Sequence, residues 1–300
     1  LKDAPMPSWF VRHIVDPLSA ALAWGVYHAV RALPVDCASA LGGRLGRTIG
    51  PLLPPHKVAV ANLALAFPEK TAAERAAIVR GMWDNLGRTF FEYPHQEHLM
   101  RMGRVEIVGL DHVRALKDDG RPGLLWSAHL ANWELVSPCA GVAGMVLHRI
   151  YRAPNNRRLD WLFRADRDLV EGELLPKGAA GAKRALMLLK KGGHLAMLVD
   201  QKLNDGVAVP FFGRPAMTAP ALASLALLFD APVVAARAIR LGGAHFRVEA
   251  LPPYTIESTG DRAADARRAM AAINATLEAW IREYPEQWLW VHRRWPKQET

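Results

Sequence analysis

The chain has 300 residues, of which 51% are hydrophobic and 22% are charged, and this composition excludes a wholly disordered protein. Lysine and arginine total 38 against 29 acidic residues, so the formal charge of +9 favours acidic partners such as anionic lipid, an acidic carrier protein or nucleic acid. Two cysteines, Cys37 and Cys139, exclude a disulfide framework and a four-cysteine zinc site. A reducing compartment is the default expectation.

The N-terminal third is expected to be helical, with a membrane-associating helix over about residues 11–33. Residues 18–27 carry no charge, but a helix that spans a bilayer needs about 20 apolar residues. We therefore expect an interfacial helix, with Trp24 and Tyr27 in the headgroup layer and flanking arginines on phosphates. The alternative is a helix buried in the core.

Two further patterns mark helices in the first 100 residues. Glycines at four-residue spacing are typical of a close-packing helix face; they are Gly42, Gly46 and Gly50. Thr71 followed by Glu74 predicts a capping box at the start of a helix that runs toward Tyr93. Because no linker follows, we expect residues 1–100 to belong to the same unit as a second region over residues 101–300.

From residue 101 the pattern changes to short apolar runs separated by helical stretches. The runs predict strands over residues 105–108, 124–126, 145–151, 195–199, 232–239 and 245–250. The intervening stretches predict helices over residues 132–140, 157–169, 180–190 and 219–228, and a long amphipathic helix over 264–283. Such alternation predicts an α/β sheet with helices packed against it.

The segment that indicates chemistry is LLWSAHLANWE, over residues 124–134. A predicted strand runs into His129, and a helix that Asn132 is expected to cap begins a few residues later. With His129 in the turn, Glu134 on the first helical turn is expected to face the imidazole. Such a carboxylate accepts a hydrogen bond from one ring nitrogen, while the other takes a proton from an attacking hydroxyl. Because GxSxG is absent, the nucleophile would belong to the substrate; the alternative is a structural histidine.

Several blocks together resemble the late acyltransferases of lipid A biosynthesis, the lauroyl and myristoyl transferases within the lysophospholipid acyltransferase-like superfamily. These blocks are SAHLANWE, YRAPNN, LDWLFRADRD, LAMLVDQK, VPFFGRPAMTAPALASLAL and PEQWLWVHRRWP, and they cover nearly the whole chain in the family's order. The resemblance implies a glycerolipid acyltransferase-like fold, with a mixed sheet flanked by helices and a helical N-terminal membrane-associating extension. Residues 101–300 would then form the α/β acyltransferase domain.

The resemblance also implies a function, namely acyl transfer from acyl-acyl carrier protein to a hydroxyl of a Kdo-bearing lipid A precursor. It implies no cofactor and no metal, and it places the enzyme on the cytoplasmic face of the bacterial inner membrane. His129 and Glu134 would be catalytic. Four further residues would bind substrate or stabilise charge: Arg164, Asp200, Asn132 and Gln201.

Acyl transfer also needs a stabilised oxyanion and a place for an acyl chain. Backbone amides in the turn over residues 130–133, or an arginine, are candidates for the oxyanion. Residues 221–229 and the region of Phe211 and Phe212 either line an acyl groove or pack in the core. Candidate contacts for acidic substrates are Arg152, Arg157, Arg158, Lys202, Arg293 and Arg294, each of which is otherwise a surface charge.

Other sites and functions are weaker interpretations. His95 and His98 lack further metal ligands at suitable spacing, and Cys139 is expected to be a buried helix residue rather than a nucleophile. No nucleic-acid motif accompanies the aromatic, basic C-terminal segment. Two alternatives stay open: an acyltransferase for another phospholipid or glycolipid, with acyl-CoA as donor, and a non-catalytic basic membrane-binding protein.

Overall fold

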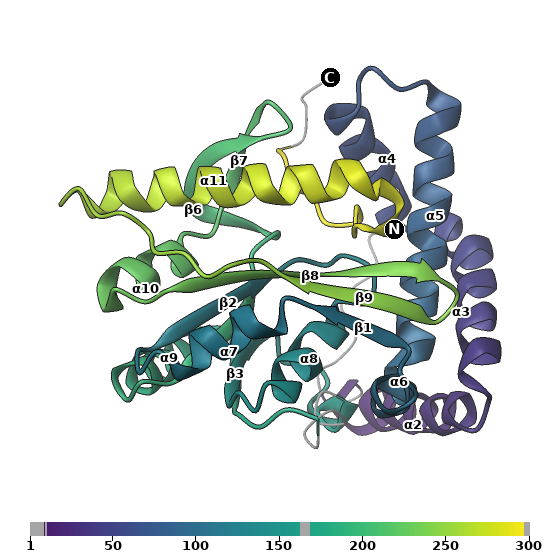
Figure 1. Ribbon diagram of the computed structural model, residues 1–300. Helices are drawn as coiled ribbons and strands as arrows, with labels where there is room; N and C mark the ends of the chain where they lie inside the picture. The colour runs from purple at the N-terminus through teal and green to yellow at the C-terminus, as the bar shows by residue number, and fades with distance from the viewer. Residues whose placement is uncertain (1–8, 10, 163–168, 297–300) are drawn as a thin grey trace.

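The computed structural model describes residues 9, 11–162 and 169–296, and its centre is a seven-stranded mixed sheet (Figure 1). The strand order is β1-β9-β8-β2-β5-β3-β4, in which only the β8–β9 pair is antiparallel. The strands are β1 (Val105–Val108), β2 (Gly123–Ser127), β3 (Leu147–Tyr151), β4 (Leu174–Pro176), β5 (His194–Leu198), β8 (Val233–Gly242) and β9 (His245–Ala250). The expected mixed α/β sheet is thus confirmed.

Helices cover both faces of this sheet, and a separate hairpin lies beside it. The helices are α2 (Asp16–Arg31), α3 (Val35–Ile49), α4 (Pro55–Ala66), α5 (Ala72–Glu92), α6 (Gln96–Arg101), α7 (Leu110–Asp118), α8 (Val136–Val142), α9 (Ala179–Lys190), α10 (Ala221–Phe229) and α11 (Arg262–Glu283). The hairpin consists of β6 (Lys202–Phe211) and β7 (Arg214–Thr218). In Figure 1, α11 and the hairpin lie above the sheet, and α7 and α8 lie below it.

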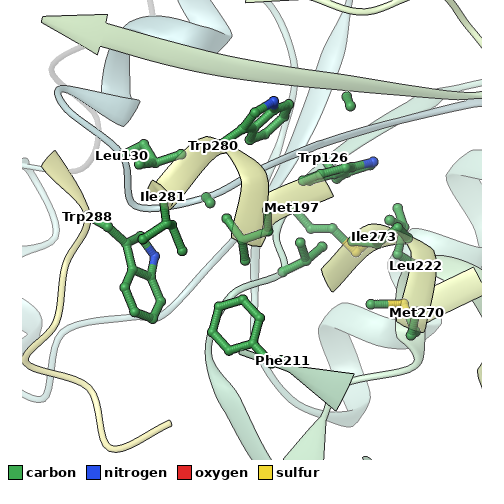
Figure 2. Packing of buried hydrophobic residues seen from close by; sticks show 14 of the residues in the cluster. Trp126, Leu130, Met197, Phe211, Leu222, Met270, Ile273, Trp280, Ile281 and Trp288 are labelled. Carbon is green, nitrogen blue, oxygen red and sulfur yellow. The ribbon is translucent and has the colours of Figure 1, made fainter. Parts of the chain in front are cut away.

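The alternation of β2 side chains divides the core into two layers. Leu124 and Trp126 point into the layer formed with α10, α11 and the N-terminal helices α4 and α5. Leu125, between them, points into the layer formed with α7 and α8. Figure 2 shows Trp126 beside Trp280 of α11, and the two rings stack with their centroids 5.0 Å apart. Burial on both faces explains why β2 is apolar throughout.

The N-terminal helices pack through the glycine face that the sequence predicts. A Cβ atom on Gly42 would lie 2.4 Å from the carbonyl oxygen of Gly87, so the backbones of α3 and α5 approach closely only because both residues lack side chains. The capping box also forms, since the hydroxyl of Thr71 accepts from the backbone of Glu74 and the Glu74 carboxylate accepts from the backbone of Thr71.

Several predicted elements differ from the structure. The helix expected over residues 157–169 is a short 3-10 turn at Arg157–Leu159, and residues 163–168 lie outside the described part. The helix expected over 132–140 begins as a 3-10 turn, Trp133–Leu135, before α8. Strands β4, β6 and β7 and helix α7 were not predicted, because a three-residue strand and a polar hairpin have weak periodicity. No helix in the described ranges is long and apolar enough to cross a membrane.

His95 links the N-terminal helices to one another and makes stability depend on pH. Its buried ring hydrogen bonds to the carbonyl oxygen of Val30 at 3.0 Å, so it holds the end of α2. Burial lowers the pKa of His95; His98 and Arg31 act in the same direction, and Glu92 opposes them. The histidine therefore has a structural role.

A group whose pKa is lowered on folding stabilises the fold fully above its unfolded pKa, and the stabilisation is lost as pH falls through the folded pKa. We expect the midpoint of thermal unfolding to fall between pH 7.5 and pH 5.5, and we expect a smaller fall for His95→Gln, which keeps an N–H for Val30. Calorimetry at both pH values checks this. An equal fall in the parent and the variant would contradict the assignment.

Candidate active site

Two parallel neighbours in the sheet, β2 and β5, bring His129 and Asp200 together. Each residue follows the carboxyl end of its strand, where the loops of adjacent parallel strands meet. The Nδ1 atom of His129 lies 2.8 Å from Oδ1 of Asp200, and the backbone N–H of His129 donates to Oδ2 at 2.9 Å. Since an ionised carboxylate only accepts, Nδ1 carries the hydrogen, and Nε2 of the neutral ring is left to act as a base.

The C-terminal segment, residues 285–296, supplies a further hydrogen bond to the Asp200 carboxylate. The indole N–H of Trp288 donates to Oδ2 of Asp200 at 2.9 Å. The backbone of the same segment pairs with the loop over residues 128–132, which we call the histidine loop. The N–H of Leu289 donates to the carbonyl oxygen of His129, and the N–H of Ala131 donates to the carbonyl oxygen of Gln287. The resemblance flagged this segment, but its position over the histidine loop is visible only in the structure.

Asp200 is almost completely buried and nevertheless stays ionised. Burial alone would raise the pKa of Asp200, but the charge and hydrogen bonds of His129 and the hydrogen bond from Trp288 outweigh it and leave the pKa lowered. The carboxylate therefore remains an acceptor for the imidazole throughout the neutral range and stabilises the imidazolium that forms when Nε2 takes a proton.

The sequence predicted that Glu134 faces the imidazole, and this prediction is wrong. In the structure the carboxylate bonded to the imidazole is that of Asp200. Oε1 of Glu134 accepts from the indole N–H of Trp133 at 2.8 Å, and the ring of Trp133 packs edge-on against His129 at 5.0 Å. The physical reason is that β5 delivers a carboxylate to Nδ1 from 71 residues away, which sequence spacing around His129 does not reveal. Glu134 and His129 still line the same cavity.

The histidine loop is held from its other side by α5. Ala131 adopts a left-handed conformation with φ of 49°, which costs about 1 kcal/mol for a residue with a Cβ. Its carbonyl oxygen accepts from Asn85 and from Thr89 at 3.1 Å each. Glu92 accepts from Asn132 and pairs with Arg240, and its carboxylate is completely buried.

Asn132 consequently has a structural position. Its side chain makes no capping hydrogen bond with the turn that follows, which contradicts the expected helix cap, and Nδ2 donates to Glu92 at 3.0 Å. The residue is fully buried against α5 rather than lining the cavity. Arg164, the other charge-stabilising candidate, lies outside the described residues.

Gln201 lies at the free nitrogen of the histidine. Its Nε2 is 3.4 Å from Nε2 of His129 and 3.3 Å from Nε2 of His292. Its Oε1 accepts from the ammonium of Lys177 at 3.1 Å. Neither Lys177 nor His292 was predicted, because each comes next to Gln201 only when the ends of β4 and β5 and the C-terminal segment meet.

A cavity of about 360 Å³ opens onto these side chains. Its polar lining includes His129, Glu134, Lys177 and Gln201. Arg152, which the sequence suggested as a contact for acidic substrates, also lines this cavity. A second, more apolar cavity of about 310 Å³ shares four lining residues with the first: Phe90, Tyr93, Trp133 and Glu134. It extends to Ala23, Val26 and Tyr27 of α2. The two cavities thus adjoin, and the apolar one lies on the side of the N-terminal helix α2.

Other candidate residues have different surroundings. The alternative that Phe211, Phe212 and α10 pack in the core is confirmed, since they belong to the layer around Trp126. Arg294 is also buried; it donates to the carbonyl oxygen of Met217 and the hydroxyl of Thr218, so it is not a substrate contact.

Cysteine and metal chemistry find no support in the described residues. Cys139 is buried on α8, and burial raises the pKa of its thiol to about 12, so it is not a thiolate nucleophile at neutral pH. Within residues 9, 11–162 and 169–296, no three His, Cys, Asp or Glu side chains gather as metal ligands.

The sequence and the fold were compared with known proteins. A family model described as "Bacterial lipid A biosynthesis acyltransferase" matches residues 9–297. A Haemophilus influenzae lipid A biosynthesis acyltransferase is 24% identical over 287 residues, covering 89% of this chain and 86% of the relative. The Escherichia coli lipid A biosynthesis lauroyltransferase is 27% identical over 295 residues, covering 91% and 90%. The solved 1-acyl-sn-glycerophosphate acyltransferase PlsC of Thermotoga maritima gives a TM-score of 0.36 at 14% identity, covering 78% of this chain and 98% of that chain.

The geometry predicts that Asp200→Asn damages turnover while preserving the fold. The amide oxygen of asparagine can still accept from Trp288, but the neutral amide no longer stabilises the imidazolium of His129 as an anion does. We therefore expect kcat to fall by roughly 10²- to 10⁴-fold. Asp205→Asn, at an exposed position on β6, is the matched control. Steady-state kinetics and a thermal melt check both variants. A folded Asp200→Asn enzyme with turnover within about threefold of the parent would refute the pairing.

Proposed function

The chain belongs to the bacterial lipid A biosynthesis acyltransferase family, and on this premise we propose that it moves an acyl chain from acyl-acyl carrier protein to a hydroxyl of a Kdo-bearing lipid A precursor. The family shows an O-acyltransferase that acylates lipid A during lipopolysaccharide biosynthesis. The donor, the acceptor hydroxyl and the steps below are the proposal. The observation that supports it best is the His129–Asp200 pair in a cavity that adjoins a second, apolar one.

In this proposal His129 is the general base. Nε2 takes the proton of the acceptor hydroxyl, and the oxygen attacks the thioester carbonyl carbon, whose π electrons move to the carbonyl oxygen. When the tetrahedral intermediate collapses, the C–S bond breaks and the carrier thiolate receives the proton from Nε2. Asp200 balances the charge of the imidazolium during both transfers. No covalent acyl-enzyme is needed.

Glu134 is proposed to act in the same cavity as the base. It lies where the polar and apolar cavities meet and is the only acidic residue in the described lining of either one. Its carboxylate is held by Trp133, which also contacts the imidazole. This position suits a group that orients the acceptor near Nε2, whereas Asp200 holds Nδ1.

The charge of the polar cavity and the adjoining apolar cavity suit the two substrates. Arg152 lines the polar cavity, and both proposed substrates, an acidic carrier protein and a phosphorylated glycolipid, are anionic. The apolar cavity between α2 and α5 offers space for fatty acyl groups.

The test is acyl transfer by the purified enzyme from labelled acyl-acyl carrier protein to the lipid A precursor. We expect His129→Ala and Glu134→Ala to lose most activity, by about 10² to 10⁴ for the base, while melting as the parent does. Near-normal turnover in either folded variant would refute its assigned role.

The same assay separates the rival functions. A clear preference for acyl-CoA, or for a glycerolipid acceptor, would replace the donor or the acceptor in the proposal. Lipid binding by both variants without thioester consumption by the parent would favour a non-catalytic membrane-binding protein.

We also propose that the N-terminal helices attach the enzyme to the cytoplasmic face of the inner membrane. Leu18 and Leu22 are one turn apart on α2 and are 65% and 70% exposed. On α3 the exposed residues Leu41, Leu45 and Ile49 repeat every four positions, about 100° around the helix from the glycine face that packs on α5. Adjacent exposed leucines on a basic protein favour an anionic bilayer surface.

Replacing both leucines of α2 should weaken this attachment. Leu18→Gln/Leu22→Gln is expected to lower partitioning onto anionic vesicles by about tenfold per leucine, because each buried leucine contributes about 1.5 kcal/mol or more. Leu228→Gln, at a 48% exposed position on α10, is the control. Vesicle sedimentation measures the partitioning. Equal binding by the double variant and the control would show that α2 does not enter the interface.

A further inference from the structure

The amide of Gln201 has a fixed orientation next to the general base. An ammonium group only donates hydrogen bonds, so the end of the amide that lies 3.1 Å from Lys177 Nζ is the oxygen. The NH₂ end therefore faces the two imidazoles, 3.4 Å from Nε2 of His129 and 3.3 Å from Nε2 of His292. Lys177 thus resolves the usual ambiguity between the two ends of a glutamine side chain.

The two imidazoles offer acceptors to this NH₂ group. Because Nδ1–H of His129 is engaged by Asp200, Nε2 of the neutral ring has a free lone pair. Partial loss of solvent around the ring, with smaller effects of His129, Lys177 and Arg152, lowers the pKa of His292 and keeps it neutral. Both N–H bonds of Gln201 can then be directed at imidazole lone pairs in the resting enzyme.

Two of the backbone donors expected to stabilise an oxyanion are used elsewhere. The amide N–H groups of Leu130 and Ala131 donate to the carbonyl oxygens of Ala128 and Gln287, and that of His129 donates to Asp200. These contacts hold the histidine in place. A side chain on the cavity wall that faces Nε2 of His129 is thus a further candidate donor for the developing charge.

We propose that Lys177 and His292 orient the Gln201 amide so that its N–H donates to the oxyanion formed in the acyl-transfer step. This inference rests on the proposed function. For proton transfer the attacking oxygen must lie about 3 Å from Nε2 of His129, so the oxyanion, two bonds further on, forms near a donor that is 3.4 Å from that nitrogen. Lys177 and His292 are positioning residues, and Gln201 makes the contact.

Proton transfer itself releases the amide. When Nε2 of His129 accepts the substrate proton it becomes a donor, so it no longer attracts the N–H of Gln201. In the same step the carbonyl π electrons become the lone pair of an oxyanion, which is a stronger acceptor. The Lys177 ammonium, hydrogen bonded to Oε1, polarises the amide and strengthens the new bond. Collapse breaks the C–S bond and returns the proton to sulfur, and the amide again faces Nε2.

A double-mutant cycle in the acyl-transfer assay tests this inference, with Lys177→Met, Gln201→Ala and the combined variant. Gln201→Ala is expected to lower kcat by about 10²-fold and Lys177→Met by about tenfold, with both KM values within about threefold. The combined variant should be no slower than Gln201→Ala, because Lys177 acts only through the amide. His292→Ala should likewise add nothing in the Gln201→Ala background.

Lys183→Met, at an exposed position on α9, is the matched control and should behave as the parent. A multiplicative loss in the combined variant, or a Lys177→Met effect confined to the KM of the anionic donor, would overturn the inference. If the parent itself transfers no acyl group, the proposed function fails instead, so the two failures are distinguishable.

Discussion

The site depends on one buried carboxylate that must be satisfied by three donors. Asp200 accepts from the His129 ring, from the His129 backbone and from the Trp288 indole. A buried charge without such partners would be strongly destabilising. The partners come from the ends of β2 and β5 and from the C-terminal segment, so the fold must bring three distant parts of the chain together. The same hydrogen bonds that satisfy Asp200 also leave one histidine nitrogen free as a base.

The N-terminal helices are part of this arrangement. Asn85, Thr89 and Glu92 lie on one face of α5 and hold the loop that follows His129, and Arg240 of β8 is bonded to all three. The loop is therefore clamped between α5 and the C-terminal segment, which sustains the left-handed backbone of Ala131. The N-terminal helices, which we propose attach the enzyme to the membrane, therefore also hold the loop that carries His129.

The two cavities meet at Trp133 and Glu134, where their chemistry changes. One has a basic rim and contains the imidazole, whereas the other is apolar and leads to α2 and its exposed leucines. The proposed reaction, which transfers an acyl chain from an anionic donor to a lipid, needs both environments close to one base. In this arrangement Gln201 lies on the polar side of the boundary, next to Nε2.

The sequence by itself predicted strands β2 and β5, the close helix packing and His129 as a candidate residue. Periodicity and capping are local signals, so β1 and β9, the Thr71 cap and the glycine face of α3 follow from neighbouring residues. Family resemblance added Asp200 and Gln201 as candidates without their contacts. Only the tertiary structure decided that Asp200 rather than Glu134 binds the imidazole, that Asn132 packs on α5, and that Lys177 and His292 adjoin Gln201. The reason is that strand order sets these contacts, and spacing along a chain carries no record of which strand ends become neighbours.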